Sequence, residues 1–147
     1  MTGDLKSQLL EFLREHQVLT LAVDGPYAAA LFYAVDEELN LYVVTDPKTR
    51  HGAAMAGRVA GTIQRDRQDW QEIRGVQLTG HCSQLTGAER ATGWAIFLKR
   101  FALAGVAELA PAFAKAELWK ITPDWLRLTD NRQGFGHKAE WTPAGCW

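Results

Sequence analysis

The fold is decided by Leu39-Asn-Leu-Tyr-Val-Val-Thr-Asp-Pro-Lys-Thr-Arg-His51. The first half of this stretch is apolar and β-branched, which predicts a strand, and the second half is a polar turn. The turn leads into a short helix over residues 49–57, with Asp46 as its N-cap, Pro47 in its first turn and Gly57 as its stop. The sequence therefore predicts a strand, a turn and a helix start in immediate succession.

The predicted helix start carries residues that can hold an anion. A helix N-terminus leaves unpaired N–H groups and a partial positive charge. Lys48, Thr49, Arg50 and His51 add two fixed cations, a hydroxyl and an imidazole at this point. The pattern predicts a phosphate pocket at the end of a strand. A solvated turn between a strand and a helix explains the same residues equally well.

Composition is that of an ordinary globular protein of one domain, residues 1–147, with 47% hydrophobic and 22% charged residues. The net charge of -1 predicts neither a nucleic-acid partner nor an anionic membrane partner. The N-terminus lacks the apolar run of a signal peptide, and no window approaches the ~18 apolar residues of a spanning helix. Cys82 and Cys146 have no metal-site spacing. We therefore expect a cytoplasmic protein with two reduced thiols.

Strands are predicted on both sides of the opening stretch. An amphipathic helix over residues 4–16 comes first, because its apolar residues recur at helical spacing. Glycines inside the later strands, Gly75 and Gly80, are typical of bulges or barrel corners. The strands are expected over residues 18–23, 27–35, from 39, 58–65, 70–85, 117–122 and 125–129, and residues 135–141 end the ordered chain. Short polar turns between the strands favour an antiparallel meander, and the internal glycines suggest a closed or half-closed barrel.

Helices are predicted in the second half of the chain. Thr86 and Glu89 form a capping box, and the helix that follows runs to about Ala104 with Gly105 as its stop. Residues 106–115 are apolar but interrupted by a proline, which indicates short, broken helices. One face of the longer helix carries Trp94, Phe97 and Phe101. We interpret this face as core or partner contact.

No catalytic constellation stands out in the sequence. The four histidines have no paired zinc spacing, and neither a nucleophile elbow nor a phosphate-binding loop is present. The small side chains of the alanines at 28–30 permit close packing on the sheet, either by a facing strand or by a flat ring. Six tryptophans raise the odds of an oligomer or a planar cofactor. Together with the basic turn, this combination favours a planar phosphate cofactor.

Three segments resemble one known superfamily. They are Val44-Thr45 followed by Lys48-Thr49-Arg50-His51, then Arg74-Gly-Val-Gln-Leu-Thr-Gly80, and finally Thr129-Asp-Asn-Arg-Gln-Gly-Phe-Gly-His-Lys138 with Trp141. On these segments the chain resembles the FMN-binding split-barrel superfamily typified by pyridoxamine 5'-phosphate oxidase. Within it, the chain is similar to the uncharacterised bacterial YhbP-like group. The resemblance covers almost the whole chain and implies a mainly β (α+β) fold, a six-stranded antiparallel split β-barrel with flanking helices.

The resemblance also implies a flavin site. In that superfamily the third strand ends along the flavin, and a Ser/Thr-Arg-Lys-like triplet after it holds the phosphate. The residues implied beside the flavin ring or ribityl chain are Ala30, Leu31, Phe32, Val44 and Thr45. Those implied at the phosphate are Lys48, Thr49, Arg50 and His51. His51 stands where lysine is common, and imidazole is largely neutral at pH 7, so we expect weaker, pH-sensitive phosphate binding.

Related proteins are homodimers whose two flavin sites are each built from both chains. The resemblance therefore implies a homodimer here. Candidates to close the site over the ring are Asn131, Phe135, His137 and Lys138. A hairpin turn with solvated ends is the alternative interpretation of these four residues.

The predicted function is that of an FMN-dependent oxidoreductase acting on an unknown small molecule by hydride transfer to the flavin. The basic residues that hold pyridoxamine phosphate in the oxidase have no match here, so vitamin B6 oxidation is not predicted. A non-catalytic protein that binds flavin, haem or another planar ligand on the same dimeric barrel is the alternative. A third possibility is a barrel that has lost its cofactor. No residue is predicted to act as an acid or a base.

Overall fold

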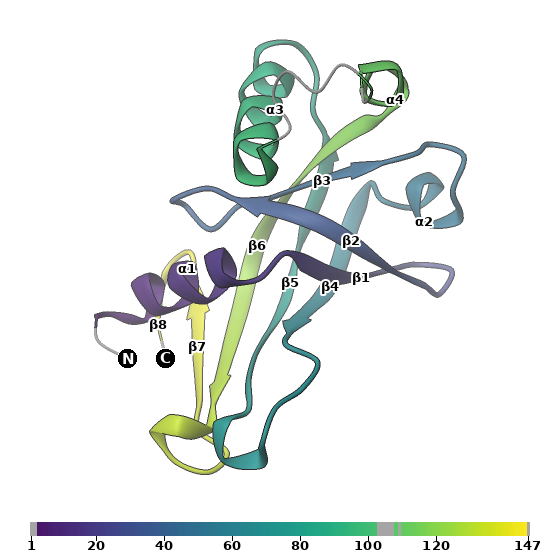
Figure 1. The fold of residues 1–147 in the computed structure, drawn as a ribbon. Helices are drawn as coiled ribbons and strands as arrows, with labels where there is room; N and C mark the ends of the chain where they lie inside the picture. The colour runs from purple at the N-terminus through teal and green to yellow at the C-terminus, as the bar shows by residue number, and fades with distance from the viewer. Residues whose placement is uncertain (1–2, 103–107, 109, 147) are drawn as a thin grey trace.

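The computed structural model describes residues 3–102, 108 and 110–146, and its main feature is a closed β-barrel (Figure 1). Its strands are β1 (Val18–Val23), β2 (Tyr27–Val35), β3 (Leu41–Thr45), β4 (Gly57–Gln64), β5 (Arg74–Gln84) and β6 (Glu117–Asp130). They pair antiparallel in the order β3-β2-β1-β4-β5-β6, and β3 pairs with β6 to close the ring. The six-stranded antiparallel barrel predicted from the sequence is thus confirmed.

The barrel core follows from alternation along the strands. In β1 every second residue is buried, and the other strands bring apolar side chains to the same interior. The buried strand residues include Leu19, Leu21, Tyr33, Leu41, Val43, Ile63, Val76, Leu78, Ile121 and Leu126. Cys82 is a free thiol in this core, and burial raises its pKa to about 12, so it stays protonated.

A helix completes this core. α1 (Leu5–Glu15) packs Leu9, Phe12 and Leu13 into the barrel interior, as the amphipathic pattern predicts. Its N-cap is Asp4, whose side chain accepts a hydrogen bond from the Ser7 backbone N–H at 2.8 Å. This hydrogen bond lowers the pKa of the Asp4 carboxyl.

β6 is one continuous strand, so the break predicted at residues 123–124 is wrong. The register against β5 shifts after Thr79, so that Gly80 faces Pro123 while Asp124 is left over as a bulge. Asp124 accepts a hydrogen bond from the Thr79 hydroxyl at 2.6 Å and pairs with Arg58. A bulge tolerates a proline that cannot donate to the ladder, which is why the strand continues.

α3 (Gly87–Phe101) and α4 (Ala110–Lys115) cover the outer face of β2 and β3 (Figure 1). They build a second apolar cluster with strand residues; its buried members are Ala34, Tyr42, Leu85, Trp94, Phe97 and Leu118. Gly93 permits the close approach, because a Cβ there would lie 2.8 Å from a methyl carbon of Leu85.

The ends of α3 differ from the prediction. Thr86 is the N-cap, but its side chain makes no capping hydrogen bond, so the predicted capping box is wrong in that respect. The helix ends at Phe101 rather than Ala104, because Ala102 turns into the left-handed region with φ +53°. The predicted stop at Gly105 lies outside the described residues, as does most of residues 106–109. α4 agrees with the short helices predicted there.

Three strand boundaries also differ. β3 begins at Leu41, because Leu39 has φ +68° and belongs to the preceding turn. Residues 70–72 form a short 3-10 helix, η1 (Trp70–Glu72), ahead of β5. At the other end, η3 (Asn131–Gln133) separates β6 from β7 (Lys138–Thr142), which pairs with β6 and with β8 (Gly145–Cys146). Within the described ranges, no helix has the length and apolar run needed to cross a membrane.

Candidate functional site

Two adjoining cavities on the outer face of β2 and β3 form the candidate site. The larger, of about 730 Å³, is lined by Gln17, Ala30, Leu31, Phe32, Val44, Phe97, Arg100, Phe101, Ala102 and Phe113. The smaller, of about 390 Å³, is lined by Val44, Thr45, Asp46, Pro47, Lys48, Ala112, Phe113, Lys115 and Ala116. Val44 and Phe113 line both, so the two cavities form one elongated depression, called the apolar groove below.

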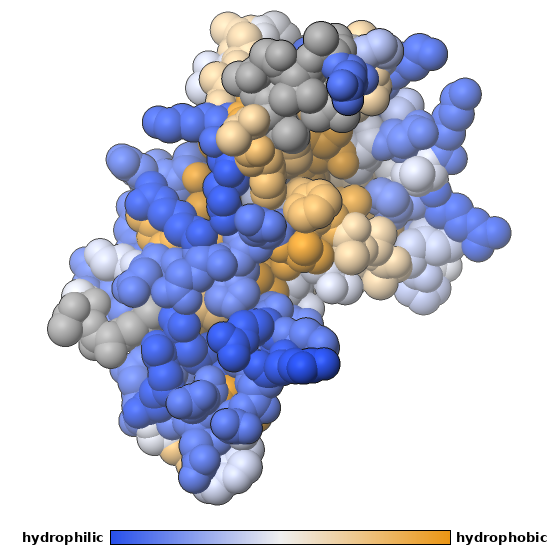
Figure 2. All heavy atoms as spheres, in the orientation of Figure 1, coloured by the Kyte–Doolittle hydropathy of each residue, from blue (hydrophilic) through white to orange (hydrophobic). Residues whose placement is uncertain are grey.

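The apolar groove lies within the most hydrophobic part of the visible surface. Figure 2 shows apolar side chains gathered over β1, β2 and the neighbouring end of α3, whereas the lower half of this face is hydrophilic. Phe32 is 58% exposed and meets Phe101 edge to face, with ring centroids 5.4 Å apart. An aromatic side chain this exposed marks a surface suited to a ligand or a partner.

Strand alternation decides which predicted ring residues can reach a ligand. Ala30 and Phe32 point outward from β2, whereas Leu31 packs against the barrel core. On β3, Val44 packs on the outer cluster and Thr45 points inward. The Thr45 hydroxyl is buried and accepts a hydrogen bond from the Trp119 indole at 2.9 Å. Its side chain is therefore committed to the barrel interior.

The turn after β3 is organised by Thr49 and not by Asp46. α2 (Arg50–Ala53) has Thr49 as its N-cap; the Thr49 hydroxyl accepts from the Gly52 N–H at 3.1 Å and donates to the Asp46 carbonyl at 2.8 Å. The prediction of Asp46 as N-cap is wrong, because its carboxylate accepts from the Lys48 N–H and closes a turn one step earlier. The helix has four residues, and Gly57, the predicted stop, opens β4 with φ +106°.

The predicted phosphate residues follow directly on the apolar groove. Lys48 lines its smaller cavity, while Thr49, Arg50 and His51 continue the chain just beyond it. The Arg50 guanidinium lies over the Tyr27 ring at 5.9 Å, and His51 Nε2 is 3.4 Å from the Thr49 hydroxyl. Among the described residues, no carboxylate forms an ion pair with Lys48 or Arg50.

The predicted closing residues lie at the opposite end of β6 from α4 (Figure 1). Fourteen residues of strand at about 3.3 Å each span on the order of 40 Å. Asn131 joins two turns there, donating to the Trp70 carbonyl at 2.6 Å and accepting from the Gly136 N–H at 3.0 Å. Phe135 is 82% exposed and meets the Trp70 ring at 5.9 Å, and Lys138 donates to the Gly136 carbonyl. One chain alone does not bring them to the apolar groove.

The prediction missed the contribution of α3 to the groove. The aromatic stripe at Phe97 and Phe101 was interpreted as core or partner contact, and both residues line the larger cavity. Arg100 is the one charged residue among the described residues that line that cavity. Its guanidinium donates to the Arg14 and His16 carbonyls at 3.2 and 3.3 Å and lies over Phe101. An arginine beside an aromatic stripe is the signal that could have indicated this role.

Solved structures define the class of protein. A heme binding protein from Mycobacterium smegmatis aligns with 97% of this chain and 60% of its own, at TM-score 0.75 and 18% identity. A pyridoxamine 5'-phosphate oxidase-like protein from Listeria innocua aligns with 85% of this chain and 98% of its own, at TM-score 0.68 and 20% identity. These likenesses show the fold: a pyridoxamine 5'-phosphate oxidase-like split barrel.

Sequence relatives then define the family. No family model matches the chain. A UPF0306 protein from Serratia proteamaculans is 34% identical over 147 residues, covering 96% of this chain and 97% of the relative. UPF0306 protein YhbP from Salmonella arizonae is 35% identical and covers 94% of this chain and 93% of the relative. The chain belongs to the UPF0306 (YhbP) family.

Proposed function

We propose that the apolar groove binds FMN and that the protein is a flavin-dependent oxidoreductase acting on a small molecule. The observation that carries this proposal is the groove itself: an outward-facing apolar cavity of about 730 Å³ that continues into a turn whose cations form no ion pair among the described residues. Cofactor sites are typically apolar clefts of roughly 300–1,000 Å³ with a few polar groups that fix orientation.

The lining residues suit a flat ring at one end of the groove. Ala30 leaves room above the sheet, and Phe32 and Phe101 supply apolar and aromatic surface on either side. Arg100 places a positive charge in the same cavity, where it can stabilise electron density that gathers on a reduced ring. Bound FMN supplies the hydride chemistry, and this chain supplies the binding surface and the charge.

The basic turn suits the phosphate at the other end. Lys48 and Arg50 are exposed and form no ion pair among the described residues, so their charges are available to an oxyanion. The Thr49 hydroxyl already donates to the Asp46 carbonyl, so its role is to shape the turn. His51 adds a donor that strengthens as it becomes protonated.

A homodimer completes the site in this proposal. The groove is open in the single chain, and an exposed aromatic tip, formed by Trp70 and Phe135, lies at the far end of the same molecule. A second copy can lay this tip, with Asn131, His137 and Lys138, over the groove. The apolar surface over β1 and β2 in Figure 2 supports such an interface.

Haem binding without turnover is the second candidate, because one fold neighbour is a heme binding protein and the aromatic lining accepts any planar ring. Against it, the described residues that line the two cavities include no histidine, cysteine or methionine to ligate iron. A Soret band in the purified protein would favour haem.

The phosphate anchor gives the direct test. Arg50→Ala should weaken FMN binding by roughly 1.5–3 kcal/mol if the guanidinium makes a charge-assisted contact with the phosphate. Arg67→Ala removes the same charge from an exposed position away from the groove and should leave the dissociation constant unchanged. Quenching of flavin fluorescence measures both. An unchanged constant for Arg50→Ala would remove Arg50 from the site.

The enzymatic part of the proposal needs a second measurement. Steady-state reduction of bound FMN by NADH or NADPH, followed by reoxidation with oxygen, should give multiple turnovers per protein. Flavin that binds and is not reduced by either nucleotide would favour the non-catalytic binding protein.

A further inference from the structure

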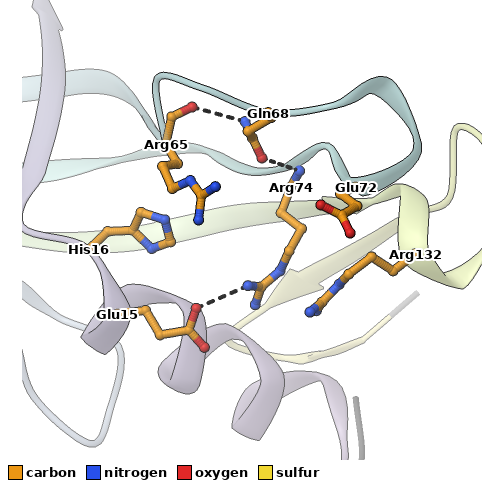
Figure 3. Close-up of a pocket in the computed structure, with 7 residues that line it drawn as sticks. All are labelled: Glu15, His16, Arg65, Gln68, Glu72, Arg74 and Arg132. Carbon is orange, nitrogen blue, oxygen red and sulfur yellow. Dashed lines mark hydrogen bonds and ion pairs between the residues drawn. The ribbon is translucent and has the colours of Figure 1, made fainter.

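Another cavity lies where the end of α1, the loop between β4 and β5 and the turn after β6 meet. It shares no lining residue with the apolar groove. It has a volume of about 290 Å³, and three arginines line it: Arg65, Arg74 and Arg132. Figure 3 shows their side chains converging on one space from separate segments of the chain. This cavity is called the arginine hollow below.

Arg74 is the unusual member of the arginine hollow. Its side chain is 15% exposed and lies over the Phe12 ring, with 5.1 Å between the guanidinium carbon and the ring centroid. Nη1 donates to Glu15 Oε2 at 3.0 Å. Nε and Nη2 are buried and have no hydrogen-bond partner among the described residues. Buried N–H groups without a partner are costly, so these two nitrogens are donors that an acceptor in the hollow would satisfy.

The rim of the hollow is braced in advance. The Gln68 side chain accepts from the Arg74 backbone N–H at 2.8 Å and donates to the Arg65 carbonyl at 3.0 Å, which ties the two arginine-bearing segments together (Figure 3). Arg132 is held by a two-pronged ion pair with buried Asp130, at 3.0 Å for each hydrogen bond. Preorganised guanidinium groups lose little entropy when they bind a planar or tetrahedral oxyanion.

The charges around the hollow balance. Its three arginines face three carboxylates, because Glu15 and Glu72 line the hollow and buried Asp130 pairs with Arg132. Glu15 is engaged by one nitrogen of Arg74, and the other two nitrogens remain free among the described residues. Recognition therefore depends on the direction of the donors more than on net charge.

We propose that the arginine hollow is a binding site for a small molecule carrying a phosphate or a carboxylate, separate from the proposed flavin groove. Arg74 and Arg65 line the same space, and there their guanidinium groups donate to the oxyanion. The volume of the hollow equals that of about ten water molecules in the liquid, which suits a small metabolite and excludes a dinucleotide.

The test is a titration of the full-length protein with inorganic phosphate and, in parallel, with succinate, at constant ionic strength set by chloride. Backbone amide shifts of Gln68, Glu72 and Arg132 report on the hollow. Those of Thr49 to Ala53 report on the flavin turn, so a phosphate bound there is distinguished. We expect saturable shifts at the hollow with at least one of the two anions, and the tighter one identifies the headgroup.

Variants assign the binding to the guanidinium groups. Arg74→Lys keeps the charge and removes the planar guanidinium group. Arg65→Gln removes an exposed cation without changing the core. Each variant should weaken anion binding about tenfold or more. Arg67→Gln changes the same charge in the same loop outside the hollow and should stay within about twofold. Shifts that do not saturate in the wild-type protein, or an equal loss in Arg67→Gln, would overturn the proposal. Because FMN is absent throughout, the result is independent of the proposed flavin function.

Discussion

The apolar groove and the arginine hollow differ in the chemistry that they offer a ligand. At the apolar groove, the polar side chains nearest the ring residues are already satisfied, as Thr45 is by Trp119, and exposed apolar area remains. At the arginine hollow the lining is charged and polar, and buried donors on Arg74 have no hydrogen-bond partner among the described residues. Exposed apolar area favours a flat, apolar ligand, whereas directed donors favour an oxyanion. We therefore propose two different kinds of site on one barrel.

The two sites also differ in what stabilises the structure around them. Around the apolar groove, packing holds α3 on the strands, and Gly93 permits their close approach. Around the arginine hollow, charge contributes, because Asp130 is fully buried beside Arg132. Burial alone would raise the pKa of Asp130, but hydrogen bonds from Arg132 and Gln133 outweigh it and lower the pKa to about 2. The same contact raises the pKa of Arg132.

The largest expected effect comes from filling the apolar groove. Ala30→Trp places an indole in the larger cavity and should weaken FMN binding at least about a hundredfold, because the ring then loses its surface. Ala28→Trp is the matched control, since Ala28 is also exposed on β2 but lines neither cavity. Fluorescence titration compares the two. Equal weakening by both variants would mean that the groove is not where the flavin binds.

A smaller effect is expected at the arginine hollow, where the ion pair of Asp130 makes stability depend on pH. Because the folded pKa of Asp130 lies below its ordinary value of 3.8, this residue stabilises the protein above about pH 4, and the contribution is lost as the pH falls toward 2. Asp130→Asn should lower the free energy of unfolding at neutral pH by about 2 kcal/mol and by little near pH 2. Urea unfolding at several pH values measures this.

The matched control for that experiment is Glu38→Gln, which removes an exposed carboxylate paired with Lys6 at 3.1 Å. Exposed pairs contribute little, so its stability curve should follow the wild type. If the free energy of unfolding of Asp130→Asn also followed that of the wild type at every pH, the buried ion pair would not stabilise the region around the arginine hollow.

The smallest expected effect concerns the turn after β3, which links the apolar groove to the proposed phosphate site. Thr49→Ala removes the N-cap of α2 and should cost about 1 kcal/mol of stability, whereas Thr49→Ser keeps the hydroxyl and should cost less. Thermal unfolding with and without FMN measures both. Similar losses in the two variants would show that the hydroxyl is not what holds the turn.

The barrel could be predicted from the sequence because its strands carry strong local signals. Residues 18–23 and 27–35 are apolar runs that turn residues separate, and they match β1 and β2 in full. Local signals failed where a long-range contact decides. Pro123 suggested a strand end, but the bulge opposite Gly80 accommodates it. Asp46 suggested a helix cap, but its carboxylate is taken by the Lys48 N–H.

The candidate site could be predicted only in part. Ala30, Phe32 and Val44, which the resemblance implies beside a flavin, line the groove because neighbouring strands bring them to one face, and Lys48 follows in the turn after β3. The contribution of Arg100 depends on how α3 docks, and the prediction did not use the one local signal of it, the aromatic stripe beside this arginine. The arginine hollow was missed altogether, since its three arginines are far apart in the chain and meet only through the loops around β5 and β6. The spacing of residues in the sequence does not indicate that these three side chains lie close together in the fold.

The central claim is that the apolar groove holds a flavin at a dimeric site. The most direct test is an absorbance spectrum of the purified protein, before and after adding FMN, on the fraction that elutes from gel filtration as a dimer. We predict flavin bands that co-elute with the dimer. A protein that retains no chromophore after FMN is added, or that shows a Soret band instead, would contradict this account.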